Sequence, residues 1–252
     1  MRIIRGLRRE AAFAIYDLFS RLMPHSEEQL AEESTDVWEH RDGDGTALVS
    51  GSHWLNQGGG WTDTFWREYG ESHLEMIKHG FRLSGRNSPI HSLVDWGSGG
   101  GSNAAAISPI VDRYFGVDIS QSNLDECVRQ TQRMGMTNFE PILIPAVRPE
   151  EVLKHVNEAD CFLSTAVYQH LPGRNYARRV TDIAKRLLTD DGIAVINIRY
   201  SNLKRGVRNW RRSYKSHATH FNHYTVWEFE MEMAYAGMEV MEIHMQPLTH
   251  HA

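Results

Sequence analysis

Residues 93–104 read LVDWGSGGGSNA, with four glycines in the five positions from Gly97 to Gly101. Glycine loses more backbone entropy on ordering than any other residue, so such a cluster is expected where the chain turns sharply or a ligand approaches the main chain. A glycine-rich turn between a strand and a helix is the nucleotide-binding position of doubly wound α/β folds, because the helix N-terminus offers free amides to the ligand. The stretch therefore predicts a ligand site that follows a first strand.

Short apolar runs alternate with amphipathic stretches from this point toward the C-terminus, a pattern typical of βαβ units and a mainly parallel sheet. The strands that we expect are residues 92–96, 114–117, 141–145, 161–165, 193–198 and 238–244. Helices are expected to begin near Asn103, Ser122, Pro149, Arg174 and Thr225. Residues 1–90 lack the alternation and read as helices around a loop. The sequence thus predicts an α/β, doubly wound, mainly parallel core in residues 91–252, with a helical N-terminal cap and substrate lid in residues 1–90.

The composition is that of a globular protein, with 41% hydrophobic and 23% charged residues among 252. No apolar run approaches the ~18 residues that a membrane-spanning helix needs. The N-terminal run MRIIRGLRREAAFAIYDLFSRLM is basic and then apolar, but Asp17 and Arg21 interrupt its apolar part. We expect a surface helix there that packs on its own domain, with peripheral membrane attachment as the alternative. Cys127 and Cys161 show no CxxC or metal-binding spacing, so we expect them to be reduced in a cytoplasmic protein.

The residues around the glycine cluster indicate which ligand it binds. The NAD fingerprint GxGxxG would need glycine at position 102, which is Ser102, and the Gly-Lys-Ser/Thr of a P-loop is missing. Asp95 lies two residues before Gly97, where a carboxylate would repel a pyrophosphate and attract an ammonium group. We therefore expect a ligand with an amino-acid end, and a dehydrogenase is disfavoured.

The stretch LVDWGSGGG resembles motif I of the class I S-adenosylmethionine-dependent methyltransferases: a hydrophobic pair, an acid, any residue, then GxGxG. This resemblance implies a Rossmann-like core that binds S-adenosylmethionine. It places Asp95 at the amino end of the methionine part of the cofactor. It also implies cofactor contacts from Gly97, Ser98, Gly99 and Gly101, where bare backbone lets the ligand approach.

A second stretch, YFGVDIS, resembles motif II of the same family. There Asp118 would accept hydrogen bonds from both ribose hydroxyls, with Ile119 beside it, and a helix-capping role is the alternative for Asp118. Tyr69, an aromatic residue ahead of the core, is implied to face the cofactor as well. The stretch IPAVRPE departs from the family, because it lacks the acid and small residue that meet the adenine amine in many relatives.

His170 is the candidate catalytic residue, in a stretch, ADCFLSTAVYQHLP, that resembles the fourth-strand segment of the family. It follows the fourth expected strand at the carboxyl edge, where doubly wound folds place their ligands. A hydroxyl acceptor loses its proton as the C–O bond forms, and a histidine with an ordinary pKa of about 6.5 can take it. The resemblance to sugar and small-metabolite O-methyltransferases also implies a histidine base here; helix capping or packing is the alternative. Gln169 and Tyr168 would add polar lining to the acceptor site.

Aromatic and histidine residues elsewhere suggest further contacts with the acceptor. Rigid amphipathic rings suit a sugar-like molecule, and we expect Trp54 of the tryptophan-rich cap among the substrate-binding residues, with ordinary packing as the alternative. The stretch SHATHFNHY places His217, His220 and His223 three positions apart. We assign His217 and His220 to substrate contact, while a metal site and a solvated loop stay open because no fixed ligand pattern is met.

A basic block in residues 199–215 contains seven Lys and Arg and no acid, in a chain with a net charge of −5. Trp210 and Tyr214 are interleaved with these charges, as in proteins that follow a nucleic-acid backbone with stacking rings. The acidic remainder of the chain argues against a dedicated nucleic-acid binder. An anionic small substrate, a partner surface and a solvated face are the other interpretations.

Together these features predict a cytoplasmic S-adenosylmethionine-dependent methyltransferase. The expected reaction is O-methylation of a sugar-like or other small polar metabolite, such as a glycoside or an anionic compound, with His170 as general base. An RNA methyltransferase that uses residues 199–215 is one alternative, and a non-catalytic protein that only binds the cofactor is another. Whether the chain forms a homo-oligomer stays open.

Overall fold

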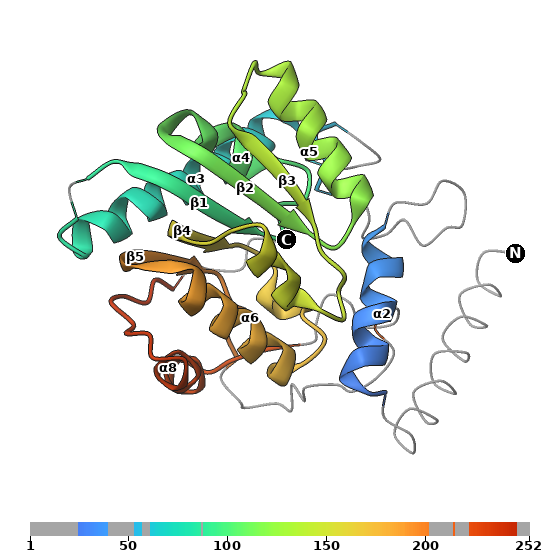
Figure 1. Ribbon diagram of the computed structural model, residues 1–252, viewed down its shortest axis with the longest axis vertical. Helices are drawn as coiled ribbons and strands as arrows, with labels where there is room; N and C mark the ends of the chain where they lie inside the picture. The colour runs from blue at the N-terminus through green and yellow to red at the C-terminus, as the bar shows by residue number, and fades with distance from the viewer. Residues whose placement is uncertain are drawn as a thin grey trace, which may run out of the picture.

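Five parallel strands form the centre of the computed structural model, which describes residues 25–39, 53–56, 61–86, 88–201, 214 and 222–245 (Figure 1). The strands are β1 (Ile90–Trp96), β2 (Val111–Asp118), β3 (Phe139–Leu143), β4 (Ala159–Ser164) and β5 (Leu188–Ile196). Their order across the sheet is β3-β2-β1-β4-β5, with every neighbouring pair parallel. The strand order reverses between β1 and β4, so their carboxyl ends form the switch point at which such sheets bind ligands.

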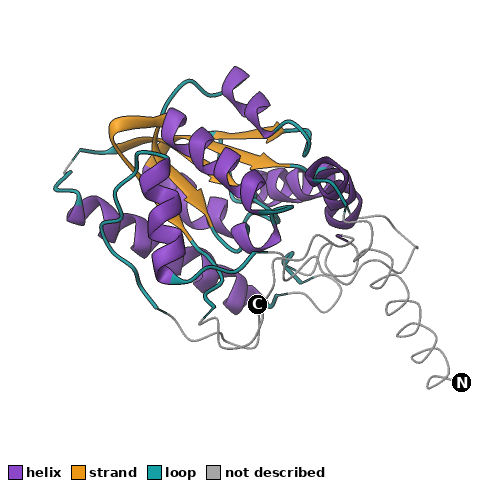
Figure 2. Cartoon of the chain, turned by 90° about the horizontal axis from the view of Figure 1, so that it is seen from below, coloured by secondary structure: helices purple, strands orange, loops and turns teal. Residues whose placement is uncertain are grey.

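Helices cover both faces of the sheet, as Figure 2 shows. In the described part of the chain the helices are α2 (Glu27–Trp38), α3 (Asp63–Leu83), α4 (Ser102–Ile107), α5 (Gln121–Arg133), α6 (Arg174–Leu187) and α8 (Val226–Tyr235), of which α2 lies to one side of the sheet (Figure 1). Three short 3-10 turns are η1 (Ser108–Ile110), η2 (Pro149–Lys154) and η3 (Tyr168–His170). The expected doubly wound α/β fold is confirmed.

Side chains along each strand alternate between two hydrophobic clusters, as the pleat of a strand requires. One cluster lies under α3, α4 and α5 and includes Ile77, Phe81, Leu93, Ile107, Tyr114, Cys127, Cys161 and Leu163. The other lies under α6 and α8 and includes Val94, Phe115, Phe162, Val180, Ile183, Phe229 and Met233. Helix α3, which the sequence analysis assigned to the N-terminal cap, is therefore a covering helix of the sheet.

Two predicted elements are wrong in detail. Residues 238–244 do not join the sheet; Glu242 Oε2 of this segment lies 2.6 Å from His79 Nε2 of α3. Alternating side chains are not enough for a strand, because the backbone groups must also pair with a neighbour. Helix α5 begins after Ser120, not Ser122, because Ser120 has the extended backbone of a cap and its Oγ accepts from Asn123 N at 3.2 Å.

No helix in the described part of the chain is long and apolar enough to cross a membrane. The basic, amphipathic run in residues 1–24 lies outside the described residues, so its expected packing stays a prediction.

A buried carboxylate joins the turn after α3 to the beginnings of two central strands. Asp160 Oδ1 accepts from Arg86 Nη2 at 2.6 Å, and Asp160 Oδ2 accepts from the backbone amides of His91 and Ser92 at 2.6 and 2.9 Å. Burial alone would raise the pKa of Asp160, but these hydrogen bonds outweigh it and lower the pKa below its ordinary value. The ionised carboxylate therefore contributes to the stability of the fold.

We expect Asp160→Asn to lower the free energy of unfolding by about 2–3 kcal/mol at pH 7, because Arg86 would lose a buried charged partner. Because the pKa of Asp160 is lowered in the folded state, the extra stability of the wild type over the variant is fully present above the unfolded-state pKa of about 3.9. It is lost as the pH falls through the folded-state pKa. Urea unfolding of both proteins at pH 7 and below about pH 3 measures the difference. A difference that stays the same at both pH values would contradict this account.

Candidate cofactor and acceptor site

The glycine loop between β1 and α4 is built around left-handed backbone. Gly97, Gly99 and Gly101 have φ values of +78°, +53° and +88°, which side-chain-bearing residues rarely adopt. A Cβ atom on Gly97 would lie 2.4 Å from Val167 Cγ2, so no side chain fits there. The loop is anchored where Gly97 N donates to Val117 O at 2.8 Å. The bare backbone at the end of β1 fits the close approach of a nucleoside cofactor.

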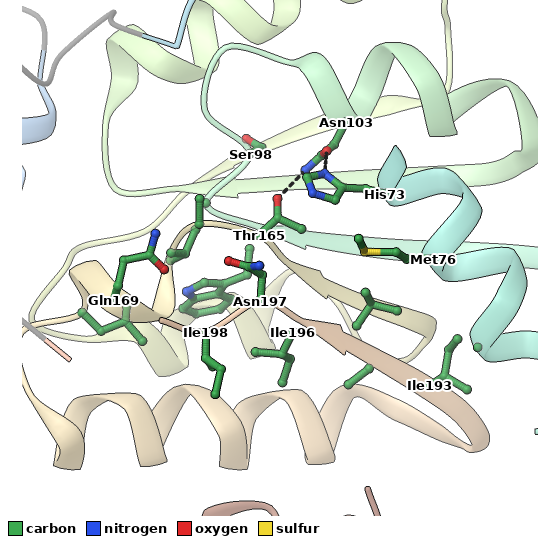
Figure 3. A pocket seen from close by; sticks show the side chains of 18 of the residues that line it. His73, Met76, Ser98, Asn103, Thr165, Gln169, Ile193, Ile196, Asn197 and Ile198 are labelled. Carbon is green, nitrogen blue, oxygen red and sulfur yellow. Dashed lines mark hydrogen bonds between the residues drawn. The ribbon is translucent and has the colours of Figure 1, made fainter. Parts of the chain in front are cut away.

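A large cleft opens at the carboxyl ends of β1, β2, β4 and β5, beside this loop (Figure 3). It follows the edge of the sheet at which doubly wound folds bind ligands. The lining side chains and backbone come from several elements that are distant in sequence, and the ones that matter below are Trp38, His53, Trp61, Tyr69, His73, Gly97, Ser98, Gly99, Asn103, Asp118, Ile119, Thr165, Ala166, Gln169, His170 and Tyr214.

Asp118 lies at the end of β2 and lines the cleft, as expected of a ribose-binding residue. Its Oδ2 accepts from Gly99 N at 3.0 Å and its Oδ1 accepts from Ser120 N at 2.9 Å. Burial raises the pKa of Asp118. The carboxylate thus fixes the glycine loop to the beginning of α5. Its contact with ribose hydroxyls stays a prediction.

Asp95 lies behind the cleft. It is fully buried, its Oδ2 accepts from Tyr114 Oη at 2.7 Å, and its Oδ1 lies 3.4 Å from Asn103 Nδ2. Burial raises the pKa of Asp95 to about 7. The side chain that lines the cleft here is Asn103, so the structure does not place the Asp95 carboxylate where it could touch a ligand ammonium group directly.

Three other predicted site residues pack around the cleft and are not among the residues that line it, so their contact with a ligand stays a prediction. Trp54 Nε1 donates to Asn123 Oδ1 at 3.0 Å, and a Cβ on Gly100 would meet its Cδ1 at 2.7 Å, so the indole packs behind the glycine loop. Tyr168 is 1% exposed and bonds through its hydroxyl to Thr181 Oγ1 at 3.0 Å. Gly101 precedes α4, and a side chain there would press on Cys127 of α5.

The 3-10 turn η3 brings Gln169 and His170 together beyond the end of β4, and both line the cleft. The His170 ring lies 5.1 Å from the Trp38 ring, centroid to centroid, in an edge-to-face arrangement. Gln169 is 6% exposed, and no described residue donates a hydrogen bond to its Oε1. A buried carbonyl oxygen of this kind needs a donor, which a bound ligand can supply.

Aromatic rings form a wall beside these two residues. The ring centroids of Trp38 and His53 are 6.3 Å apart, as are those of His53 and Trp61. The ring centroids of Trp61 and Tyr69 are 4.5 Å apart. Trp38 is held in place by its Nε1, which donates to Tyr214 Oη at 2.7 Å. Such a wall offers broad apolar faces with polar edges to a ligand.

The carboxylate of Glu39, which follows α2, anchors this part of the wall to the core. It accepts from Ser120 Oγ at 2.9 Å and from Ser122 Oγ at 2.6 Å, at the beginning of α5. These contacts fix the end of α2, and with it Trp38, above the cleft.

Several residues that no expectation from sequence included also line the cleft. His73 lies one helical turn after Tyr69 on α3, and Asn103 follows the glycine loop, so both spacings carried a signal. Thr165 and Ala166 follow β4 directly. Ala166 adopts a φ of +56°, and strained backbone of this kind clusters at functional sites. No sequence pattern indicates this strain.

Some predicted features fall on residues outside the described ranges. His217 and His220 fall outside the described residues, as does most of the basic block in residues 199–215, of which 199–201 and 214 are described. In the described part of the chain, no group of three or more His, Cys, Asp or Glu side chains could hold a metal ion.

Comparisons with known proteins support the fold. Residues 94–196 match a family model described as a methyltransferase domain. A putative methyltransferase from Bacillus halodurans C-125 shares the fold, with a TM-score of 0.52 and 15% identity over 66% of this chain and 68% of its own.

Two more distant structures were also found. The YcgJ protein from Bacillus subtilis has a TM-score of 0.46 and 19% identity over 62% of this chain and 66% of its own. An S-adenosylmethionine-dependent methyltransferase from Clostridium acetobutylicum has a TM-score of 0.41 and 13% identity over 52% of this chain and 50% of its own. The chain thus spans less than two thirds of the length of each of these two. A comparison with curated proteins gives no match.

Proposed function

We propose that residues 94–196, which match the methyltransferase-domain model, bind S-adenosylmethionine as cofactor, and that the protein methylates a hydroxyl group of a small, sugar-like polar acceptor. The observation that carries this proposal is the pairing of His170 with Gln169 on η3, both lining the cleft beyond the end of β4. In this proposal His170 is the general base and Gln169 binds the acceptor.

The chemistry of an alcohol explains why a base is needed. S-adenosylmethionine supplies a methyl group on a positively charged sulfur, which is already activated for transfer. An alcohol is a weak nucleophile at neutral pH until its proton is removed. His170 takes the hydroxyl proton as the acceptor oxygen bonds to the methyl carbon and the carbon–sulfur bond breaks. The bonding electrons stay on sulfur, and the products are the methyl ether and S-adenosylhomocysteine.

The surroundings of His170 favour a polar acceptor with several hydroxyl groups. The Oε1 of Gln169, to which no described residue donates, can accept hydrogen bonds from hydroxyl groups. The rings of Trp38 and Trp61 offer flat faces on which the apolar C–H face of a sugar ring can lie. A glycoside or an anionic sugar derivative combines both properties.

A cytoplasmic location is part of the proposal. Cys127 and Cys161 are buried and form no disulfide, as is usual for proteins of a reducing compartment.

Mass spectrometry of acceptor mixtures tests the proposal. Purified protein is incubated with S-adenosylmethionine and, separately, with hydroxylated sugars and glycosides, small amines, and total RNA. We expect one added methyl group, stable to mild acid and base as an ether is, on a member of the sugar set. Methylation confined to an amine or to RNA would contradict the proposed acceptor class.

A further inference from the structure

His73 lines the cleft, lies away from Gln169 in Figure 3, and has no role in the chemistry proposed above. It projects from α3, is 5% exposed, and its Nδ1 lies 2.8 Å from Asn103 Oδ1. Figure 3 shows Asn103 between His73 and Thr165, beside the glycine loop that carries Ser98. Asn103 Nδ2 lies 3.0 Å from Thr165 Oγ1 and 3.4 Å from Asp95 Oδ1.

These contacts determine the tautomer of His73. The amide nitrogen of Asn103 donates to Thr165 and Asp95, so its Oδ1 is the atom that faces His73 and can only accept. His73 Nδ1 therefore carries the hydrogen and donates it. Burial lowers the pKa of His73, which outweighs the opposite effect of the Asn103 contact, so the ring is neutral near pH 7. In a neutral ring with a protonated Nδ1, Nε2 holds a lone pair.

The Nε2 atom of His73 is available to a ligand. Among the described residues, Asn103 is the only hydrogen-bonding partner of this ring, and the ring lines the cleft. The ring also contacts the Tyr69 ring, whose centroid lies 4.3 Å away in an edge-to-face arrangement. The lone pair on Nε2 can therefore accept a hydrogen bond from a ligand in the cleft.

The chain of contacts from Asp95 to His73 strengthens this acceptor. Asp95 attracts the amide hydrogen of Asn103, Asn103 Oδ1 attracts the Nδ1 hydrogen of His73, and each bond polarises the next. The Asp95 carboxylate, which does not line the cleft, thereby makes Nε2 of the cleft-lining His73 ring a stronger hydrogen-bond acceptor. The same logic operates where a carboxylate behind a histidine sets its tautomer and raises its basicity.

We propose that His73 Nε2 accepts a hydrogen bond from the α-ammonium group of the cofactor, and that Asn103 and Asp95 position it. The ammonium group suits the site because it is a donor only and is positively charged, whereas the carboxylate of the same amino acid has no hydrogen to donate. This inference rests on the cofactor assignment and is independent of which acceptor is methylated. It assigns Asp95 an indirect role at the amino end of the ligand.

Calorimetric titration with two ligands tests the inference. One ligand is S-adenosylhomocysteine, and the other is its deaminated analogue, in which hydrogen replaces the α-amino group. We expect His73→Leu to weaken S-adenosylhomocysteine binding by about 10- to 100-fold, the effect of a hydrogen bond to a charged group, and to leave the analogue unaffected. His73→Gln, which offers both a donor for Asn103 and an acceptor for the ligand, should recover most of the loss.

His79→Leu is the matched control, because His79 is on the same helix, lines the same cleft, and pairs with Glu242 at 2.6 Å. It should leave both affinities unchanged. Thermal unfolding without ligand checks that His73→Leu folds; if it does not, His73→Ala takes its place in the same comparison. Equal losses for both ligands, or no loss for either, would overturn the inference. Wild-type protein that fails to bind S-adenosylhomocysteine would instead contradict the cofactor assignment.

Discussion

His170→Ala is expected to lower kcat for methyl transfer to a hydroxyl acceptor by about 10²- to 10⁴-fold, the usual contribution of a general base. We expect kcat to fall because alanine cannot accept the hydroxyl proton of the acceptor. The affinity for S-adenosylhomocysteine should stay within about twofold of wild type, since the variant leaves unchanged the glycine loop and Asp118, which are the expected cofactor contacts. Initial rates and calorimetric titration measure the two effects separately.

His91→Ala is the control for this prediction. His91 lies near the beginning of β1, at the opposite edge of the sheet from the cleft, and its exposed ring pairs with Asp112 at 2.6 Å. We expect unchanged kcat. Full turnover by His170→Ala on the true acceptor would show that the base lies elsewhere.

Gly97→Ala is expected to weaken S-adenosylhomocysteine binding by at least about tenfold, or ~1.4 kcal/mol. Its Cβ would lie 2.4 Å from Val167 Cγ2, and valine is too stiff at χ1 to turn aside. The backbone at Gly97 also has a φ of +78°, which alanine disfavours. The loop must therefore shift, and with it the surface that faces the ligand. Calorimetric titration of the variant measures the loss.

Gly135→Ala separates this effect from ordinary backbone strain. Gly135 follows α5 with a φ of +73°, but a Cβ there would meet nothing within 4 Å. Its replacement should cost about 1 kcal/mol of stability, as a left-handed alanine does, and leave ligand affinity unchanged. An unaltered affinity in Gly97→Ala would mean that the ligand does not lie against this turn.

The periodicity of the sequence was enough to predict most of the core. β1, β4 and β5 follow apolar runs, and α8 begins after Thr225, as expected, where Thr225 and Glu228 form a capping box. Residues 238–244 have an equally good alternating pattern and are not a strand, because pairing depends on a neighbouring backbone that sequence does not show. Ser122 and Ser120 are similarly hard to separate, since both have a polar residue three positions later.

The position of the candidate site in the fold could be predicted from the sequence, but the contacts between its side chains could not. The glycine loop, Asp118 and His170 come together at the switch point, as the positions of their residues after successive strands require. The burial of Asp95 could not be predicted, because it depends on Tyr114 and Asn103, which meet this carboxylate from other elements. His73 was missed for the same reason: its significance comes from a contact with Asn103 across 30 residues of sequence.

Thermal unfolding of the wild-type protein with S-adenosylhomocysteine or with NAD tests the central claim, that the glycine loop binds an amino-acid-bearing nucleoside. At a concentration of 100 times the dissociation constant, S-adenosylhomocysteine should add ~2.7 kcal/mol to the free energy of unfolding. NAD at the same concentration should leave the free energy of unfolding unchanged. Position 102 is Ser102 and not the glycine of the NAD fingerprint, and NAD has no amino-acid end for the cleft to bind. Stabilisation by NAD without stabilisation by S-adenosylhomocysteine would contradict the account.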